Sequence, residues 1–212
     1  MSANSLTSRD SRVLNLLFNS ESQNDADDPV DVENFPVFPV SHINNDQLVE
    51  LQDAERRAVQ LAEGGLLEEA DALLSTKIQK YPTERPSLWT NRAQVRRLVG
   101  DMRATLSDLS TAIQIATPPK YFRPSPDYSR ILSQAYTHRA TIYLLAARED
   151  VVGVSESHTS EELEELASRD FDFAGRYGNE LAKAMAVRTN PYAKLCGAIV
   201  QTALMKEMGD GS

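Results

Sequence analysis

The densest group of chemically active side chains in the sequence is a run of four glutamates: Glu161, Glu162, Glu164 and Glu165. Carboxylates placed this close can bind a divalent cation or exchange protons with a substrate. They also favour the first turn of a helix, where the backbone dipole is positive. The apolar spacing that follows them predicts such a helix, so we interpret the run as a solvated helix start.

Residues that bind soft metals are scarce: Cys196, His42, His138 and His158. They are too few to form a structural zinc site. A single cysteine cannot form an intramolecular disulfide, which favours a reducing, cytoplasmic location. No base stands beside Cys196 to activate its thiol, so we expect it to pack as a small hydrophobic residue. We expect His138 to be a polar groove residue or plain surface, since no second ligand accompanies it.

Sequence signatures of catalysis and nucleotide binding are missing. The adjacent glycines Gly64 and Gly65 end a predicted helix and do not follow a strand, so they are not a phosphate loop. Neither a Gly-x-Ser-x-Gly elbow nor a His-Glu-x-x-His pair occurs. We therefore predict no catalytic residues, no metal and no cofactor. A remote alternative is an enzyme whose reactive residues meet only in the folded chain.

The overall charge of the chain is negative. Its 212 residues include 22 basic and 31 acidic side chains, a net charge of −9, and 41% are hydrophobic. This composition supports a buried core and argues against nucleic acid as a partner. The first ten residues lack the basic and apolar regions of a leader, and the fairly apolar residues 193–205 are too few to span a bilayer. We expect a soluble protein without a membrane partner; its oligomeric state stays open.

Residues 1–45 form an acidic N-terminal arm, with seven acidic residues against two arginines. Four apolar residues make one stripe on a short predicted helix: Val13, Leu14, Leu17 and Phe18. Because so short a helix is unstable alone, we expect it to dock on the rest of the chain. The alternative is a free arm whose stripe binds a partner. Residues 21–39, which are acidic and rich in proline, predict a poorly ordered linker along the domain surface.

Residues 46–188 predict an all-α domain, because apolar residues recur every three or four positions and strand-like alternation is missing. The chain repeats itself here at an offset of 35 residues: Ala58 with Ala93, Gly65 with Gly100, Ala70 with Thr105, and Leu74 with Leu109. Each unit has the pattern of a helical hairpin. Its small residues allow close helix packing, its glycine permits a left-handed turn, and its leucine fills the space between hairpins.

A third unit repeats the pattern with interruptions. Its predicted helices are residues 127–148 and 161–175. Four of its residues repeat earlier positions: Tyr136, Ala140, Ala167 and Phe171. Fifteen inserted residues separate its two helices, and twelve more precede the unit around residues 118–127. We expect both insertions to be loops or helix extensions at the hairpin ends.

The pattern resembles the tetratricopeptide repeat and is best kept in the second unit, at Trp89, Ala93, Gly100, Leu109 and Ala112. Arg96 and Thr105 depart from it, at positions where an aromatic residue and alanine are usual, and only the first unit has its closing proline. The resemblance covers about 130 residues. It implies three tetratricopeptide-like hairpins, the third interrupted by an insertion; the alternative is a helical bundle without repeats.

The end of the chain predicts a capping helix. Asn190 is a good N-cap and Pro191 is tolerated at the first helical position, so a last helix should run to about Met208. This capping segment, residues 189–208, would cover the open face of the third unit, with Cys196 packed among its apolar residues. Residues 209–212 are a tail.

Three stretches carry a narrower resemblance: residues 13–19, 91–101 and 190–196. They are similar to the tetratricopeptide repeat protein 36 family, a family of small three-repeat proteins. The resemblance implies a cytosolic protein that binds the seventy-kilodalton heat-shock chaperone and, in animals, is linked to tyrosine breakdown.

In such an array the first helix of each hairpin forms the inner wall, so repeat spacing predicts the groove residues: Thr90, Asn91, Gln94, Arg97, His138 and Thr141. Asn91 is the strongest candidate, because an amide can pair with both donors and acceptors of a peptide backbone. We predict a non-catalytic adaptor that binds a protein or peptide there, with a heat-shock chaperone as one candidate partner. The alternative is a structural protector that binds a folded metabolic enzyme through the convex face or inserted loops.

Four arginines form a local basic cluster: Arg92, Arg96, Arg97 and Arg103. We expect them to pair with acidic residues of the chain's own arm. The alternative is that they hold an acidic partner.

Many tetratricopeptide domains grip the acidic tail of a heat-shock chaperone with a carboxylate clamp of lysine, arginine and two asparagines. Only Asn91 matches that clamp. Glu55 and Val59 stand where lysine and asparagine would be needed, and Gln134 and His138 where lysine and arginine would be. Glu55 would repel a terminal carboxylate, so we expect any chaperone contact not to use the clamp.

Overall fold

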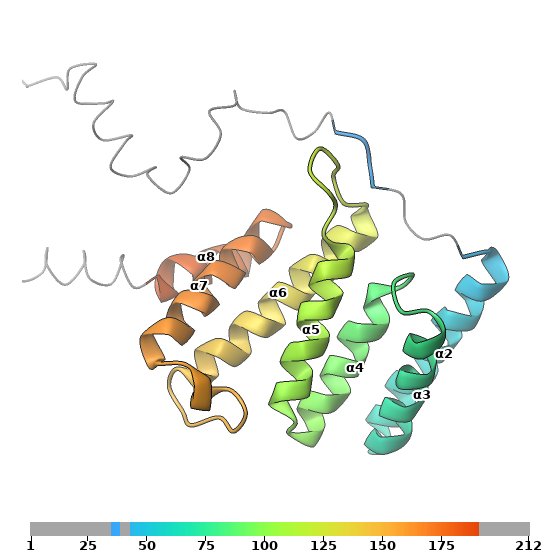
Figure 1. The fold of residues 1–212 in the computed structure, drawn as a ribbon, viewed down its shortest axis with the longest axis horizontal. Coiled ribbons are helices and arrows are strands. Elements are labelled where there is room, and N and C mark those ends of the chain that lie inside the picture. Colours follow the sequence, from blue (N-terminus) through green and yellow to red (C-terminus); the bar gives the residue numbers. More distant parts are fainter. Residues whose placement is uncertain (1–34, 39–42, 191–212) are drawn as a thin grey trace, which may run out of the picture. The chain divides into compact units, whose positions relative to one another are not determined.

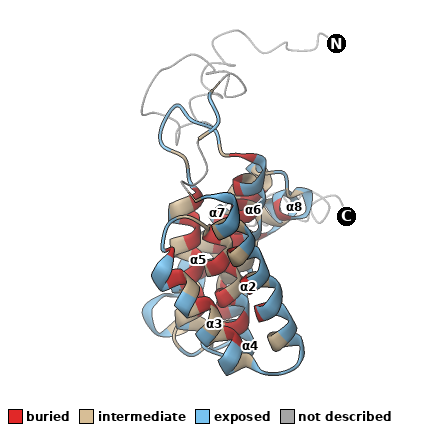
Figure 2. Ribbon diagram, turned by 90° about the vertical axis from the view of Figure 1, so that its right-hand side faces the viewer, coloured by how far each residue is buried: buried red, intermediate tan, exposed pale blue. Residues whose placement is uncertain are grey.

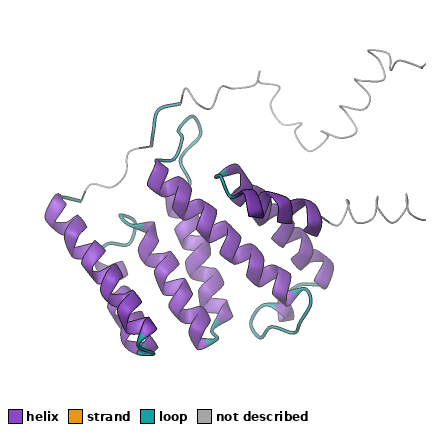
Figure 3. Cartoon of the chain, turned by 180° about the vertical axis from the view of Figure 1, so that it is seen from behind, coloured by secondary structure: helices purple, strands orange, loops and turns teal. Residues whose placement is uncertain are grey.

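The computed structural model describes residues 35–38 and 43–190. The chain divides into two compact units, Met1–Phe35 and Pro36–Ser212, and the account below concerns the second. Its α-helices are α2 (Asn45–Glu63), α3 (Leu67–Lys80), α4 (Pro86–Val99), α5 (Met102–Ala116), α6 (Pro126–Ala146), α7 (Ser160–Arg176) and α8 (Glu180–Thr189). The described part holds one isolated bridge and no strand, so the predicted all-α class is confirmed (Figure 3).

The helices pair into three successive hairpins, α2 with α3, α4 with α5, and α6 with α7 (Figure 1). Each helix packs on the next along the chain, and α4 also contacts α2 and α6. The first helices of the three hairpins therefore share one face, as the tetratricopeptide resemblance implies. We call this face, formed by α2, α4 and α6, the inner face.

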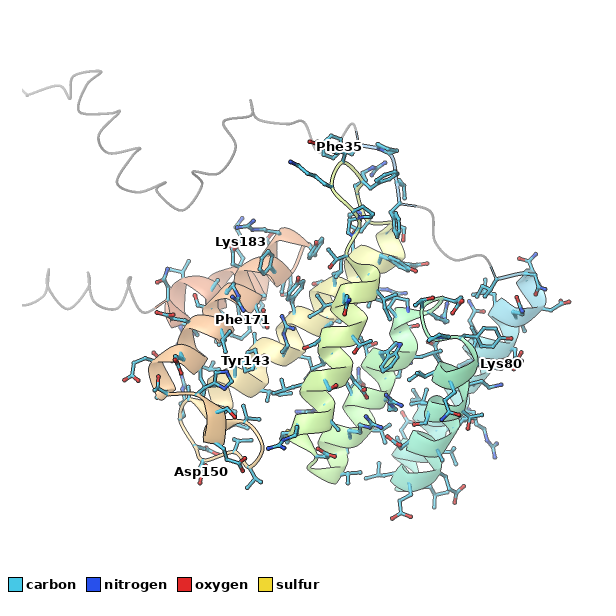
Figure 4. All side chains as sticks on the ribbon, in the orientation of Figure 1. Phe35, Lys80, Tyr143, Asp150, Phe171 and Lys183 are labelled. Carbon is cyan, nitrogen blue, oxygen red and sulfur yellow. The ribbon has the colours of Figure 1, made fainter. Side chains whose placement is uncertain are left out.

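The positions that define the repeat form the core (Figure 2). Each hairpin has a buried alanine at the same position of its first helix: Ala58, Ala93 and Ala140. Because alanine is small, neighbouring helices can pack closely at these positions. Their counterparts on the second helices are also buried: Ala70, Thr105, Ala167, Leu74, Leu109 and Phe171. In the third hairpin Phe171 belongs to the same core cluster against which Tyr143 packs (Figure 4). The aligned repeat positions therefore coincide with the buried core.

Local signals fix the ends of the helices. Gly100 closes α4 with a φ of 94°, in the left-handed region that glycine adopts without strain. Thr159 caps α7 through a capping box with Glu162, and Glu161 also lies in the first turn. The interpretation of the glutamate run as a solvated helix start is confirmed.

Each predicted insertion forms a loop at a hairpin end and also lengthens the helix that follows it, α6 or α7, relative to the second hairpin. In the first, the backbone N–H of Phe38 donates to the carbonyl of Arg123 at 2.8 Å, and that of Arg123 donates to Pro36 at 3.0 Å. The described part of the linker therefore lies along the domain, as predicted. The second insertion contains the short 3-10 helix η3 (Ser155–Ser157) and is anchored by the buried side chain of Val154.

The sequence pattern did not predict α8 as a separate helix. It packs on α7 and buries Ala182, and its N-cap is Asn179, whose side chain donates to Thr137 of α6 at 2.9 Å. It therefore covers part of the third hairpin. The predicted capping helix beyond Asn190, with Cys196, lies outside the described residues, as does the predicted arm helix at residues 13–18.

Candidate partner-binding groove

A buried ion pair joins the two helices of the second hairpin. Arg92 of α4 donates to Asp108 of α5 from Nε at 2.9 Å and from Nη2 at 2.8 Å. Its Nη1 donates to the hydroxyl of Ser75, on α3 of the preceding hairpin, at 2.9 Å. The guanidinium also lies over the ring of Trp89, 4.9 Å from its centroid. One arginine thus holds together three helices from two hairpins.

The third hairpin repeats this arrangement. Arg139 of α6 donates to Asp170 of α7 at 2.6 Å and 2.9 Å, and to Ser110 of α5 at 3.0 Å. Its guanidinium lies 5.5 Å from the ring centroid of Tyr136. Each arginine directly precedes the small residue of its unit, and each aspartate directly precedes the large apolar residue. The network is therefore part of the repeat, and it fixes how each hairpin sits on the one before it.

Three arginines of the basic cluster pair within the chain, as predicted, but their partners lie in the repeat domain. Arg96 pairs with Asp71 at 2.8 Å and with Asp108 at 3.2 Å, and Arg103 pairs with Glu156 at 3.1 Å. Their partners therefore belong to the repeat domain, whereas the acidic arm lies outside the described residues. Sequence reasoning missed the buried pairs because it treated the arginines as surface charges. The recurrence of arginine three residues after Trp89 and after Tyr136 was the signal that could have revealed them.

A cavity of about 520 Å³ opens on the inner face, between the first halves of α2, α4 and α6. Its walls include Glu55 of α2, Asn91 of α4 and Gln134 of α6. Glu55 accepts hydrogen bonds from Arg85 at 3.0 Å and 2.7 Å, and another from the hydroxyl of Ser87. Its charge is thus paired within the chain, which weakens the repulsion that the sequence predicted for this residue.

A second cavity of about 250 Å³ lies between α2 and α4, further along the same face. Its walls are mostly apolar, with Val59 and Ala62 on α2 and Leu98 on α4. Asn91 lines both cavities, and Gln94 lines the second. We call the two cavities together the inner groove.

The predicted groove residues on α4 differ in accessibility. Asn91 is half-buried and Gln94 is exposed, and both face the inner groove. Thr90 lines the first cavity, but it is buried and its hydroxyl donates to the carbonyl of Ser87 at 3.0 Å. Asn91 and Gln94 therefore offer amide groups that have no hydrogen-bond partner among residues 35–38 and 43–190, while Thr90 forms part of the wall.

The other three predicted residues line neither cavity and lie in the second halves of α4 and α6. Arg97 is exposed, and Thr141 is exposed with its hydroxyl bonded to the Thr137 carbonyl at 2.8 Å. Burial, and to a lesser degree the positive charge of Arg97, lowers the pKa of His138 to about 4. The Nε2 atom of His138 is buried without a hydrogen-bond partner among the described residues. His138 is therefore neutral at pH 7 and offers no charge to a carboxylate.

Over residues 35–38 and 43–190, no group of three or more His, Cys, Asp or Glu side chains is placed to hold a metal ion. In the same ranges no helix is long and apolar enough to cross a bilayer.

Known proteins of similar sequence place the chain in a family. It is 35% identical to the L-tyrosine degradation gene cluster protein hmgX of Aspergillus fumigatus, over 96% of this chain and 94% of that protein. It is 31% identical to tetratricopeptide repeat protein 36 of Bos taurus, over 92% of each chain. Identity to the Homo sapiens protein of that name is 32%, over 77% of this chain and 71% of the human one.

No protein-family model matches the chain, and no solved structure matches it. The three relatives are named as repeat or gene-cluster proteins and not as enzymes. Their similarity spans most of the chain, and the three hairpins have the repeat architecture that their name describes. The chain belongs to the tetratricopeptide repeat protein 36 family.

Proposed function

We propose that the protein is a non-catalytic adaptor that binds a protein or peptide partner in the inner groove. The observation that carries this proposal is the position of Asn91, whose side chain lines both cavities on the face shared by α2, α4 and α6. An amide placed there can hold the backbone of an extended segment by donating and accepting hydrogen bonds. The buried arginine networks favour the same role, because they fix α4 and α6 to their neighbouring helices before a partner arrives.

We propose a cytoplasmic protein whose partner acts in L-tyrosine degradation. The support is the printed name of the Aspergillus fumigatus relative, which is 35% identical over nearly the whole chain. The seventy-kilodalton heat-shock chaperone is a second candidate partner, which the family resemblance suggests.

A photo-crosslinking amino acid at a single position tests the groove. We would place it at Gln94, which is exposed on α4 and lines the second cavity. The matched control is Gln114, an exposed glutamine on α5, the other helix of the same hairpin. The probes are the purified enzymes of L-tyrosine degradation and the purified chaperone. We expect crosslinks from position 94 and not from position 114.

The opposite pattern would support the protector function. Crosslinks from position 114, or from Val152 in the second inserted loop, without any from position 94 would place the partner on the outer surface and overturn the groove proposal.

A further inference from the structure

The second cavity of the inner groove has the size and lining of a pocket for one side chain. Its volume of about 250 Å³ lies below the roughly 300–1,000 Å³ of pockets that hold drug-sized ligands. Its floor reaches the buried core residues Leu74 and Val95. Its rim carries apolar side chains that are open to solvent, with Val59 47% exposed and Leu98 59% exposed. A large apolar side chain would cover this surface and displace its water.

Among the described residues that line the second cavity, the charged one is Glu63. Its side chain is exposed and makes no hydrogen bond or ion pair within the described ranges. Glu63 is also the last residue of α2, whose final turn contains no basic residue. A carboxylate at this end of a helix is disfavoured by the dipole, so Glu63 does not stabilise α2. A cation supplied from outside would satisfy it.

The residues that line the first cavity also include more carboxylates than arginines. Its arginines are already paired, Arg85 with Glu55 at 2.7 Å and Arg130 with Asp127 at 3.3 Å. Glu84 lines the cavity as well and has no such cationic partner in the part of the chain described. Both ends of the inner groove thus leave a carboxylate without a cation, and complementarity favours a basic occupant over an acidic one.

We propose that the second cavity holds one large apolar side chain of a partner segment, next to a lysine or arginine of that segment that pairs with Glu63. This inference rests on the proposed function and names the chemistry of the partner. The charge of such a segment is opposite to that of the acidic chaperone tail that a carboxylate clamp would bind.

Selection from a random twelve-residue peptide library displayed on phage, against the purified full chain, tests the proposal. Wild type should enrich peptides with Leu, Met, Phe or Trp beside Lys or Arg. The variant Glu63→Lys should enrich the same apolar residues beside Asp or Glu. The best wild-type peptide should bind Glu63→Lys about five- to tenfold more weakly, because an attraction between charges becomes a repulsion.

Two further variants keep the result interpretable. Glu165→Lys, which makes the same charge change at an exposed position of α7, should leave the selected sequences and the affinity unchanged. Ala62→Phe should fill the cavity and abolish binding of both peptide sets. Glu63→Lys should unfold at no lower a temperature than wild type, since it removes a carboxylate from the negative end of α2.

Several results would overturn the proposal. These are acidic or charge-independent peptides selected by wild type, no enrichment at all, or an unchanged preference in Glu63→Lys. If position 94 still crosslinks to the partner while the peptides lack a basic residue, the groove function stands and this inference fails. If position 94 does not crosslink either, both fail.

Discussion

Arg92 holds the buried carboxylate of Asp108 through two hydrogen bonds of 2.9 Å and 2.8 Å. Removing one partner of a buried pair leaves the other charged and desolvated, which costs about 3–5 kcal/mol. We therefore expect Asp108→Ala to lower the free energy of unfolding by about that amount. Urea denaturation followed by circular dichroism measures it.

An exposed pair provides the control for this prediction. Asp172 and Arg176 of α7 are 2.7 Å apart on the surface, so Asp172→Ala should cost less than about 1 kcal/mol. In the double variant Arg92→Met with Asp108→Leu, neither charge remains unpaired, so much of the lost stability should return. Equal losses for the two aspartate variants would contradict this account of the network.

The depressed pKa of His138, about 4, makes stability depend on pH. Between pH 6.5 and 4 the unfolded chain binds a proton at this residue that the folded chain does not, so stability should fall as pH is lowered through that window. Below about pH 4 this contribution should level off. His138→Gln should flatten the pH dependence, whereas His158→Gln, at an exposed position, should not.

The same pKa can be measured directly by an NMR titration of the His138 imidazole. Because the positive charge of Arg97 contributes to the shift, Arg97→Gln should move the pKa upward toward its usual range. A pKa near 6.5 in wild type would show that the imidazole is not buried as the structure has it.

The turn at Gly100 depends on its backbone conformation and not on crowding. Its φ is 94°, and a Cβ placed there would meet no atom within 4 Å. Gly100→Ala should therefore cost about 1–2 kcal/mol through backbone strain alone. Gly64→Ala is the control: its φ is −78°, in the right-handed helical region, so alanine fits there without that strain. Thermal unfolding of the two variants should separate them by several degrees, and equal midpoints would contradict the left-handed turn.

The carboxylate clamp is tested with a short peptide that ends in Glu-Glu-Val-Asp. His138 is neutral at pH 7, and Glu55 already occupies Arg85, so no free cation of the first cavity is placed to hold a terminal carboxylate among the described residues. Isothermal titration should show weak binding that does not change when the C-terminus is amidated. Tight binding that amidation removes would show that a clamp exists.

Much of the fold was predictable because small residues recur at a fixed spacing in the sequence. Ala58 and Ala93 must both be small for the helices to approach, so an offset of 35 residues located the hairpins and their core. The buried arginines were not predicted, because an arginine at a single position is usually exposed. Their burial becomes evident only from the aspartate on the next helix, which is Asp108 for Arg92 and Asp170 for Arg139. The pairing of Glu55 with Arg85 depends on contacts across 30 residues, which no local pattern shows.

The groove itself was predicted in part. Repeat spacing selected Asn91 and Gln94, which do face the cavities, but it gave no sign that Thr90 is buried. Glu63 was missed because the last residue of a helix, read alone, looks like ordinary surface. Whether any of these residues binds a partner stays a prediction.

The adaptor function is tested most directly by the affinity of one double variant for a partner. Asn91→Ala with Gln94→Ala removes the two amides that line the inner groove, whereas Gln79→Ala with Gln114→Ala removes two amides at exposed positions of α3 and α5 outside both cavities. Dissociation constants would be measured against the purified enzymes of L-tyrosine degradation and the purified heat-shock chaperone. We predict at least about a tenfold loss of affinity for the first variant and none for the second. Undiminished binding by the inner-face variant would contradict the groove as the binding site.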